Sequence, residues 1–302
     1  MKLSNLLTEQ RNENSMNLDQ LPTMDILKII HQEDKKVEKA VEEVLPQINE
    51  AVENIYERLS RGGRLIYVGA GTSGRLGVLD SSECPPTFMT DPEMVQTLMA
   101  GGMGAFFEAK EGSEDNEEQG AQDLFNKNVT ENDVIVGITA SGRTPYPIGA
   151  LKKAKEVGSY TVSLSCNPHS LISEYADTAI EVIVGPEVLT GSTRMKAATA
   201  HKMILNMIST TTMVKLGKVY ENLMVDVQAS NFKLMNRARR IIMDITNVSY
   251  EEADRVLSET KNQVKPAIVM IKSGVDVNQA QQAINDSDGD VRKAIQLALD
   301  QK

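Results

Sequence analysis

The sequence predicts an α/β protein in which helices cover both faces of a mostly parallel sheet, with a small helical domain at the C-terminus. Short apolar runs that end in glycine alternate with stretches of helical periodicity, which is typical of parallel strands joined by right-handed crossovers. The last part of the chain contains helical patterns alone. At 302 residues the chain can form one large domain or two modest ones, with ample sequence for a buried core.

The N-terminal region is expected to be a polar arm followed by helical structure. Residues 1–20 are polar and rich in asparagine, which indicates an extended arm. From about Met24 to Leu59 apolar residues recur at helical spacing. Pro46 lies inside this stretch, and we expect it to kink or divide the helix because proline lacks the backbone N–H that a helix interior needs.

Strand candidates follow, and a long helix is expected after the last of them, from about Thr193 to Leu216. Each candidate is short, rich in β-branched residues and bounded by glycine or polar residues. They are GGRLIYVGAG at 62–71, NDVIVGITASG at 132–142, GSYTVSLSCNP at 158–168 and AIEVIVG at 179–185.

The C-terminal region contains an internal repeat. Residues 253–268, ADRVLSETKNQVKPAI, align with residues 280–295, AQQAINDSDGDVRKAI, 27 positions further along. Each copy is helical, is interrupted by a polar turn, and resumes with Val, a basic residue and Ala-Ile. We therefore expect two related helical units, of a kind that more often serves packing or dimerisation than catalysis.

Composition argues against several classes of function. The 42 acidic and 32 basic residues give a formal net charge of −10, which argues against a nucleic-acid-binding surface. The 2 cysteines cannot form a disulfide framework, and no apolar run is long enough for a membrane span, so we expect a cytoplasmic protein. The 3 histidines are scattered without ligand spacing, so neither a metal nor another cofactor is expected.

Two similar turns follow the first two strand candidates. Residues 67–75, YVGAGTSGR, align with residues 135–143, IVGITASGR, and share Val, Gly, Ser, Gly and Arg. Ligands of open α/β sheets bind outside the carboxyl ends of the strands. We therefore expect both turns to face a common crevice.

The first turn admits three functional interpretations besides a plain strand-to-helix connection. GAGTSG at 69–74 satisfies the dinucleotide pattern G-x-G-x-x-G, but CPPTFMTDPEM at 84–94 is not expected to supply the second strand with its acidic end. A P-loop would require Lys and then Ser or Thr where Arg75 and Leu76 stand. The third interpretation is a phosphomonoester held by hydroxyl and backbone N–H groups at a helix N-terminus. The residues assigned to substrate binding are Gly71, Thr72, Ser73, Ser141, Gly142, Arg143 and Thr144.

Three segments together resemble the N-acetylmuramic acid 6-phosphate etherases of the sugar-isomerase (SIS) superfamily, which is related to the glucokinase regulatory proteins. They are VGAGTSGRLGVLDSSECPPTF at 68–88, TASGRTPY at 139–146 and GPEVLTGSTRMKAATAHK at 185–202. The resemblance spans nearly the whole chain and implies a three-layer αβα sandwich of the SIS type. Together with the internal repeat, the resemblance predicts an arm and helix at 1–50, an SIS sugar-phosphate domain at 51–245, and a small helical, UBA-like domain at 246–302.

The resemblance also implies a reaction, in which water cleaves the D-lactyl ether of the sugar phosphate by β-elimination and water addition, in amino sugar and cell-wall recycling. Such chemistry needs a general acid and a general base, and the family pattern assigns these roles to Glu83 and Glu114. A homodimer is implied as well. A sugar-phosphate isomerase and a non-catalytic sugar-phosphate-binding regulator remain alternatives. GSTRMK at 191–196 is either a capped helix start or a further anion site.

Overall fold

The computed structural model describes residues 6–108, 110, 112–227 and 232–301. The chain divides into two compact units, Met1–Ser82 with Glu93–Ser209, and Glu83–Pro92 with Thr210–Lys302. The predicted limits at 50 and 245 stay predictions. None of the helices in the described ranges is both long and apolar enough to cross a lipid bilayer.

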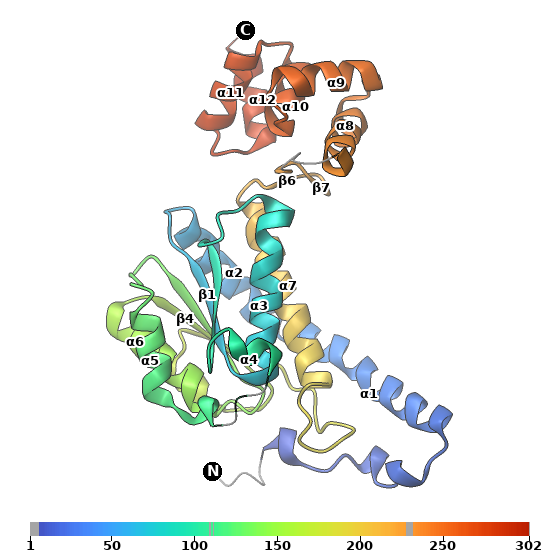
Figure 1. The fold of residues 1–302 in the computed structure, drawn as a ribbon, viewed down its shortest axis with the longest axis vertical. Coiled ribbons are helices and arrows are strands. Elements are labelled where there is room, and N and C mark those ends of the chain that lie inside the picture. Colours follow the sequence, from blue (N-terminus) through green and yellow to red (C-terminus); the bar gives the residue numbers. More distant parts are fainter. Residues whose placement is uncertain (1–5, 109, 111, 228–231, 302) are drawn as a thin grey trace. The chain divides into compact units, whose positions relative to one another are not determined.

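Within the described residues, the first unit contains one sheet of five parallel strands (Figure 1). The strands are β1 (Leu65–Gly69), β2 (Val95–Met99), β3 (Val134–Ile138), β4 (Tyr160–Ser165) and β5 (Thr178–Glu181). Their order across the sheet is β2-β1-β3-β4-β5. All five residues of β1 and of β3 are buried, as expected for central parallel strands covered on both faces.

Helices cover both faces of this sheet, which confirms the predicted three layers. Ile66 and Val68 of β1 pack with buried side chains of α5 (Glu117–Phe125) and α6 (Pro145–Val157) on one face. Tyr67, which points the other way, donates a hydrogen bond of 2.9 Å to Asp80 of α3 (Gly71–Phe88). Asp80 in turn accepts hydrogen bonds from Asn206 and Ser209 of α7 (Lys196–Lys215).

Pro46 divides the N-terminal helical stretch, as predicted. Helix α1 (Thr23–Glu43) ends before it, and α2 (Leu45–Leu59) carries the proline in its first turn, where the missing N–H costs nothing. The remaining elements of this unit are η2 (Leu7–Glu9), η3 (Glu13–Ser15), η4 (Leu18–Gln20), α4 (Gly104–Phe107), η5 (Ser113–Asp115) and η6 (Leu171–Tyr175).

The second unit is mainly helical and shows the internal repeat in three dimensions. Besides a short antiparallel pair, it comprises α8 and two helix pairs that share one apolar core. Their bounds are β6 (Val219–Tyr220), β7 (Leu223–Met224), α8 (Phe232–Thr246), α9 (Tyr250–Glu259), α10 (Val264–Ser273), α11 (Val277–Asp286) and α12 (Val291–Asp300). The bounds of α11 and α12 lie 27 positions after those of α9 and α10.

The turns inside the two helix pairs match atom for atom. The Thr260 hydroxyl donates to the carbonyl oxygens of residues 256, 257 and 263. The Ser287 hydroxyl, 27 positions later, donates to those of residues 283, 284 and 290. Asn262 and Gly289 both have positive φ and both donate a backbone N–H five residues back, at 2.8 and 2.9 Å. The repeat is therefore one structural unit used twice.

Candidate active site

The two similar turns lie next to each other at the carboxyl edge of the sheet. One follows β1 and the other follows β3, and these strands are neighbours with Gly69 paired to Ile138. In the order 2-1-3-4-5, the β1/β3 junction is where the connections change direction, and ligands of such sheets bind there. The two turns therefore lie at one edge of the sheet, and the common crevice predicted for them stays a prediction.

The first turn brings the start of α3 close to β1. A Cβ added to Gly74 would lie 2.8 Å from the carbonyl oxygen of Gly69, so only glycine permits this approach. Gly71 has φ +54°, a conformation that glycine adopts without strain. In the described part of the chain the hydroxyls of Thr72 and Ser73 have no side-chain hydrogen bond. They and the first N–H groups of α3 are thus available to an anion.

The second turn is tied together by its own hydroxyl groups. Thr139 Oγ1 lies 2.7 Å from Thr144 Oγ1 and 3.2 Å from Ser141 Oγ, and Ser141 Oγ accepts the N–H of Arg143. Gly142 has φ +72°, and a Cβ there would lie 2.2 Å from the Ser170 hydroxyl. These contacts hold the turn in one shape.

Asn167, a residue not predicted from the sequence, links this turn to the N-terminal arm. Its buried amide donates to the carbonyl oxygens of Ala140 and Ser141 and to the hydroxyl of Thr8. Its Oδ1 accepts the backbone N–H of Leu7 at 2.6 Å. Asn167 stands two positions after the end of β4, at the same edge of the sheet as the other turns, and this position is the sequence signal that could have identified it.

Glu114 shares a cavity of about 220 Å³ with the first turn. Gly71 and Arg75 also line it. The Arg75 guanidinium is fixed by hydrogen bonds of 2.9 Å to the carbonyl oxygens of Ala105 and Phe106. Lys110, another lining residue, donates to the Gly101 carbonyl. Two cations thus face the cavity that holds Glu114, and neither was among the predicted site residues.

The second turn and Glu83 lie outside that cavity. Ser141 and Arg143 line a separate cavity of about 180 Å³ together with His169 and Glu174. Glu83 is exposed on α3, ten residues beyond Ser73, which corresponds to about 15 Å along a helix. The two cavities and Glu83 are therefore distinct features of the described chain, and no single cavity collects all predicted residues.

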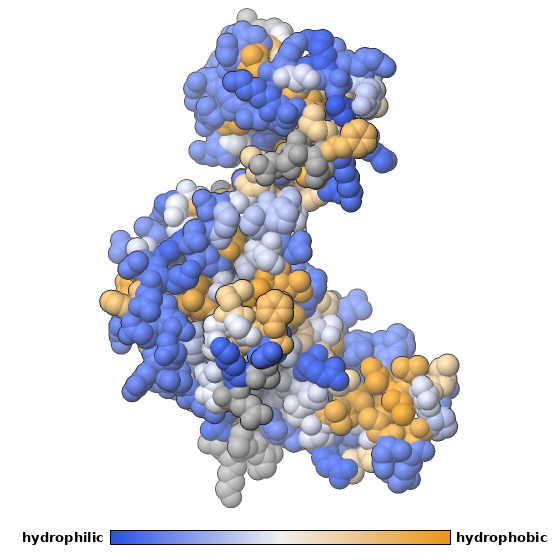
Figure 2. All heavy atoms as spheres, in the orientation of Figure 1, coloured by the Kyte–Doolittle hydropathy of each residue, from blue (hydrophilic) through white to orange (hydrophobic). Residues whose placement is uncertain are grey.

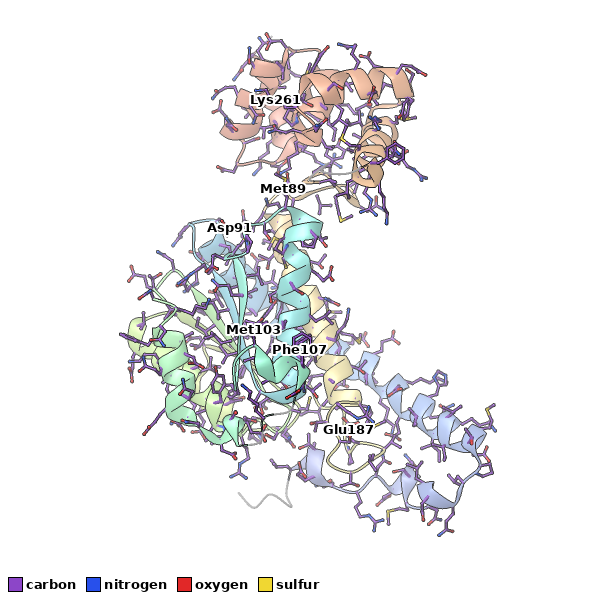
Figure 3. The ribbon with its side chains drawn as sticks, viewed as in Figure 1. Met89, Asp91, Met103, Phe107, Glu187 and Lys261 are labelled. Atoms are coloured by element: carbon purple, nitrogen blue, oxygen red, sulfur yellow. The ribbon has the colours of Figure 1, made fainter. Side chains whose placement is uncertain are left out.

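The first backbone N–H groups of α7 bind the carboxylate of Glu187, a residue of the same chain. Glu187, labelled in Figure 3, is fully buried and accepts the N–H groups of Lys196 and Ala197, each at 3.0 Å. Burial raises the pKa of Glu187 despite these hydrogen bonds. The first N–H groups of α7 are therefore already bonded to a carboxylate of the chain, rather than to the hydroxyl groups of GSTRMK.

A buried ion pair lies beside it. The Lys196 ammonium is 2.7 Å from the Glu33 carboxylate of α1, and their side chains are 1% and 2% exposed. Asn14 of the arm also donates to Glu33, at 2.8 Å. The pair joins α1, the arm and the first turn of α7.

Comparison with known proteins identifies the domain and the relatives. Residues 47–155 match the glucokinase regulatory protein N-terminal SIS domain, and residues 106–211 match the SIS domain. The chain is 55% identical over 295 residues to N-acetylmuramic acid 6-phosphate etherase 1 of Bacillus licheniformis, covering 98% of this chain and 97% of that protein. It is 56% identical over 296 residues to the N-acetylmuramic acid 6-phosphate etherase of Bacillus subtilis, with coverage of 98% and 97%.

A solved structure supports the fold alone. A phosphoheptose isomerase from Francisella tularensis superposes with a TM-score of 0.52 at 17% identity, covering 64% of this chain and all of that chain. The matches to the SIS domain and to this structure confirm the predicted fold class.

Proposed function

The chain belongs to the family of N-acetylmuramic acid 6-phosphate etherases, and from this premise we propose that its two Ser-Gly turns bind the substrate phosphate while Glu83 and Glu114 perform the chemistry. The enzyme cleaves the D-lactyl ether of its substrate to N-acetylglucosamine 6-phosphate and D-lactate, a step in amino sugar and cell-wall recycling. The isomerase and regulator alternatives are not favoured, because relatives at this identity over the full chain are etherases.

One observation carries the binding assignment. Two turns that carry hydroxyl groups follow the neighbouring strands β1 and β3, with Thr72 and Ser73 in one turn and Ser141 and Thr144 in the other. Hydroxyl and backbone N–H donors at a helix start suit a phosphate dianion. We assign the phosphate to this edge, with Gly71, Gly142 and Arg143 shaping it.

The chemistry explains why two carboxyl groups are needed. A base removes the proton from carbon 2 of the open-chain sugar, next to the aldehyde, and the electron pair expels the lactate oxygen from carbon 3. An acid protonates that oxygen as it leaves, because an unprotonated alkoxide leaves poorly. Water then adds to carbon 3 of the unsaturated aldehyde.

We assign the base to Glu114 and the acid to Glu83. Glu114 shares its cavity with the first phosphate turn, which supports a position next to the sugar. Arg75 and Lys110 supply the positive charge in that cavity, and we assign them to the lactate carboxylate. The direct test is incubation of the purified protein with N-acetylmuramic acid 6-phosphate. D-lactate should appear, and aldose–ketose interconversion of another sugar phosphate without lactate would favour an isomerase.

Replacing Ser73 or Ser141 with alanine is expected to weaken substrate binding. Each change removes a hydrogen bond to a charged group, worth about 1.5–3 kcal/mol, so KM should rise roughly 10- to 150-fold. Steady-state kinetics measures this. Ser60→Ala, an exposed serine at the end of α2, is the matched control and should leave KM unchanged. An unchanged KM in both test variants would remove the phosphate assignment.

We also propose that the enzyme is a homodimer with the site near the subunit interface. The N-terminal half of α1 exposes apolar side chains, among them Met24 at 61% exposed and Leu27. Figure 2 shows an apolar area over this helix. Phe107 of α4, labelled in Figure 3, is 84% exposed beside residues that line the Glu114 cavity. Apolar faces of this kind are typical of surfaces that a second copy covers.

Light scattering at micromolar concentration is expected to give twice the mass of one chain. Leu27→Lys places a charge on the apolar face of α1 and should shift the protein toward monomer, whereas Lys28→Glu, on an exposed neighbouring position, should not. An active monomer of the unaltered chain would contradict this proposal.

We further place the enzyme in the cytoplasm. Cys84 and Cys166 are both buried and form no disulfide, which is ordinary for a protein of a reducing compartment.

A further inference from the structure

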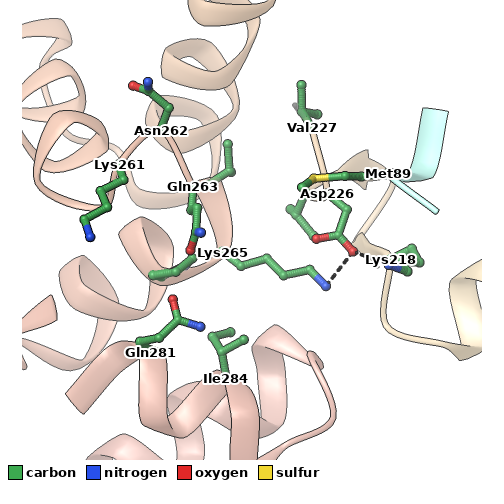
Figure 4. A pocket seen from close by; sticks show the side chains of 13 residues that line it. Met89, Lys218, Asp226, Val227, Lys261, Asn262, Gln263, Lys265, Gln281 and Ile284 are labelled. Atoms are coloured by element: carbon green, nitrogen blue, oxygen red, sulfur yellow. Dashed lines mark ion pairs between the residues drawn. The ribbon is translucent and has the colours of Figure 1, made fainter. Parts of the chain in front are cut away.

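The second unit contains a cavity of about 530 Å³ that has no part in the proposed reaction (Figure 4). Pockets of 300–1,000 Å³ are typical of small-molecule sites. Its lining combines lysines, amide side chains and apolar groups. The polar lining residues are Lys218, Asp226, Lys261, Asn262, Gln263, Lys265 and Gln281.

The charges in this cavity do not balance. Asp226 is the carboxylate among the lining residues, and it lies 2.8 Å from the Lys265 ammonium and 3.0 Å from that of Lys218. Lys261, an exposed lysine, also lines the cavity. Lys265 is only 8% exposed, so solvent screens it little. Figure 4 shows Lys218 and Lys265 converging on the one carboxylate.

The internal repeat shows that this arrangement is not required by the fold. The residue equivalent to Lys265 in the second helix pair is Arg292, which is largely exposed and lies 3.6 Å from Glu221. The residue equivalent to the uncharged Gln263 is Asp290, a carboxylate. Asp290 also acts electrostatically on Lys265 without lining the cavity. The first pair thus buries a cation and lacks a carboxylate at a position where the second pair has one.

We propose that this cavity is a second binding site of the enzyme, for a small phosphomonoester with a body of about monosaccharide size. Lys218 and Lys265 hold the phosphate, since lysine ammonium groups bind phosphate as point charges. The amides of Asn262, Gln263 and Gln281 lie where hydroxyl groups of the ligand would need partners. Val264 and Ile284, on α10 and α11, pack against its carbon skeleton.

The test is a titration of the full chain carrying Ser73→Ala and Ser141→Ala, which weaken the site proposed for the substrate. The probes are inorganic phosphate and glucose 6-phosphate, added at constant ionic strength and followed by isothermal titration calorimetry. We expect saturable binding of both probes, tighter for glucose 6-phosphate. Adding Lys265→Met should raise Kd at least tenfold, and Lys218→Met should act in the same direction.

Lys272→Met is the matched control, because Lys272 is exposed on the same helix and does not line the cavity. Circular dichroism shows whether Lys265→Met folds. If it does not fold, Lys218→Met is the test variant instead, because Asp226 keeps its ion pair with Lys265 in that variant. The proposal is overturned if the chain carrying only the two serine changes shows no saturable binding. It is also overturned if Kd is unchanged in Lys265→Met or, where that variant does not fold, in Lys218→Met. Tighter binding of inorganic phosphate than of glucose 6-phosphate overturns the assignment of a sugar-sized ligand.

Discussion

Replacing Glu114 with glutamine is expected to abolish both D-lactate release and exchange of the carbon-2 proton with solvent. Glutamine cannot accept that proton, and a positioned base contributes about 10²–10⁴-fold to the rate. Both signals can be followed by NMR in D₂O. Glu118→Gln, an exposed change in the neighbouring helix α5, should leave both rates intact.

Glu83→Gln is expected to separate the two signals, lactate release and carbon-2 exchange. Lactate release should fall by a similar factor because the leaving oxygen is no longer protonated, while some carbon-2 exchange remains, since proton abstraction does not require departure of lactate. The reverse pattern in the two variants would exchange their roles. Full activity in either variant would remove that residue from the mechanism.

Replacing Lys196 with methionine is expected to lower the free energy of unfolding by about 3–5 kcal/mol. The Glu33 carboxylate stays buried in this variant but loses the buried ammonium group that pairs with it. Urea unfolding at pH 7 measures this. Adding Glu33→Gln should recover part of the loss, because no buried charge is then left over. Equal stability of Lys196→Met and the unaltered chain would mean that the pair contributes nothing.

The same pair predicts how stability depends on acid. Burial alone would raise the pKa of Glu33, but hydrogen bonds from Lys196, Lys36 and Asn14 outweigh it and lower the pKa from 4.5 to about 2. A carboxyl with a lowered pKa in the folded state stabilises fully above its unfolded value, and this contribution is lost as pH falls from about 4.5 to 2. The stability difference between the unaltered chain and Glu33→Gln should therefore shrink across that window.

The position of the two Ser-Gly turns at one edge of the sheet could be predicted because it depends on local sequence. The segments at 67–75 and 135–143 each place a serine and a glycine directly after a buried strand, and parallel strands bring such turns to one edge. Pro46 divided its helix as expected for the same kind of local reason.

Strand β2 was not predicted, because it depends on pairing with β1 rather than on a pattern in its own sequence. VQTLM at 95–99 alternates weakly and follows the proline-containing segment at 84–94, which indicated no strand. Its pairing with β1, Leu65 against Val95, creates the strand at the sheet edge. No acidic residue stands at its end, since Met99 is followed by Ala100 and Gly101, so the dinucleotide interpretation still lacks its carboxylate.

Long-range polar contacts were equally beyond prediction. Glu33 and Lys196 lie 163 positions apart, and Glu33 stands in a stretch of charges that is indistinguishable from a solvated helix face. Only the folded chain shows that the two neutralise each other. The hydrogen bonds from the first N–H groups of α7 to the Glu187 carboxylate were likewise not predictable from the GSTRMK segment.

The duplicated helix pair has a consequence for the order of folding. Its turns close loops of only a few residues, such as Thr260 to Gln263, so forming them loses little chain entropy. The central strands β1 and β3 instead pair Gly69 with Ile138, which lie 69 positions apart in the sequence. Folding rates fall as such separations grow. The helix pairs should therefore assemble early, while the sheet, whose edge carries the two Ser-Gly turns, sets the overall rate.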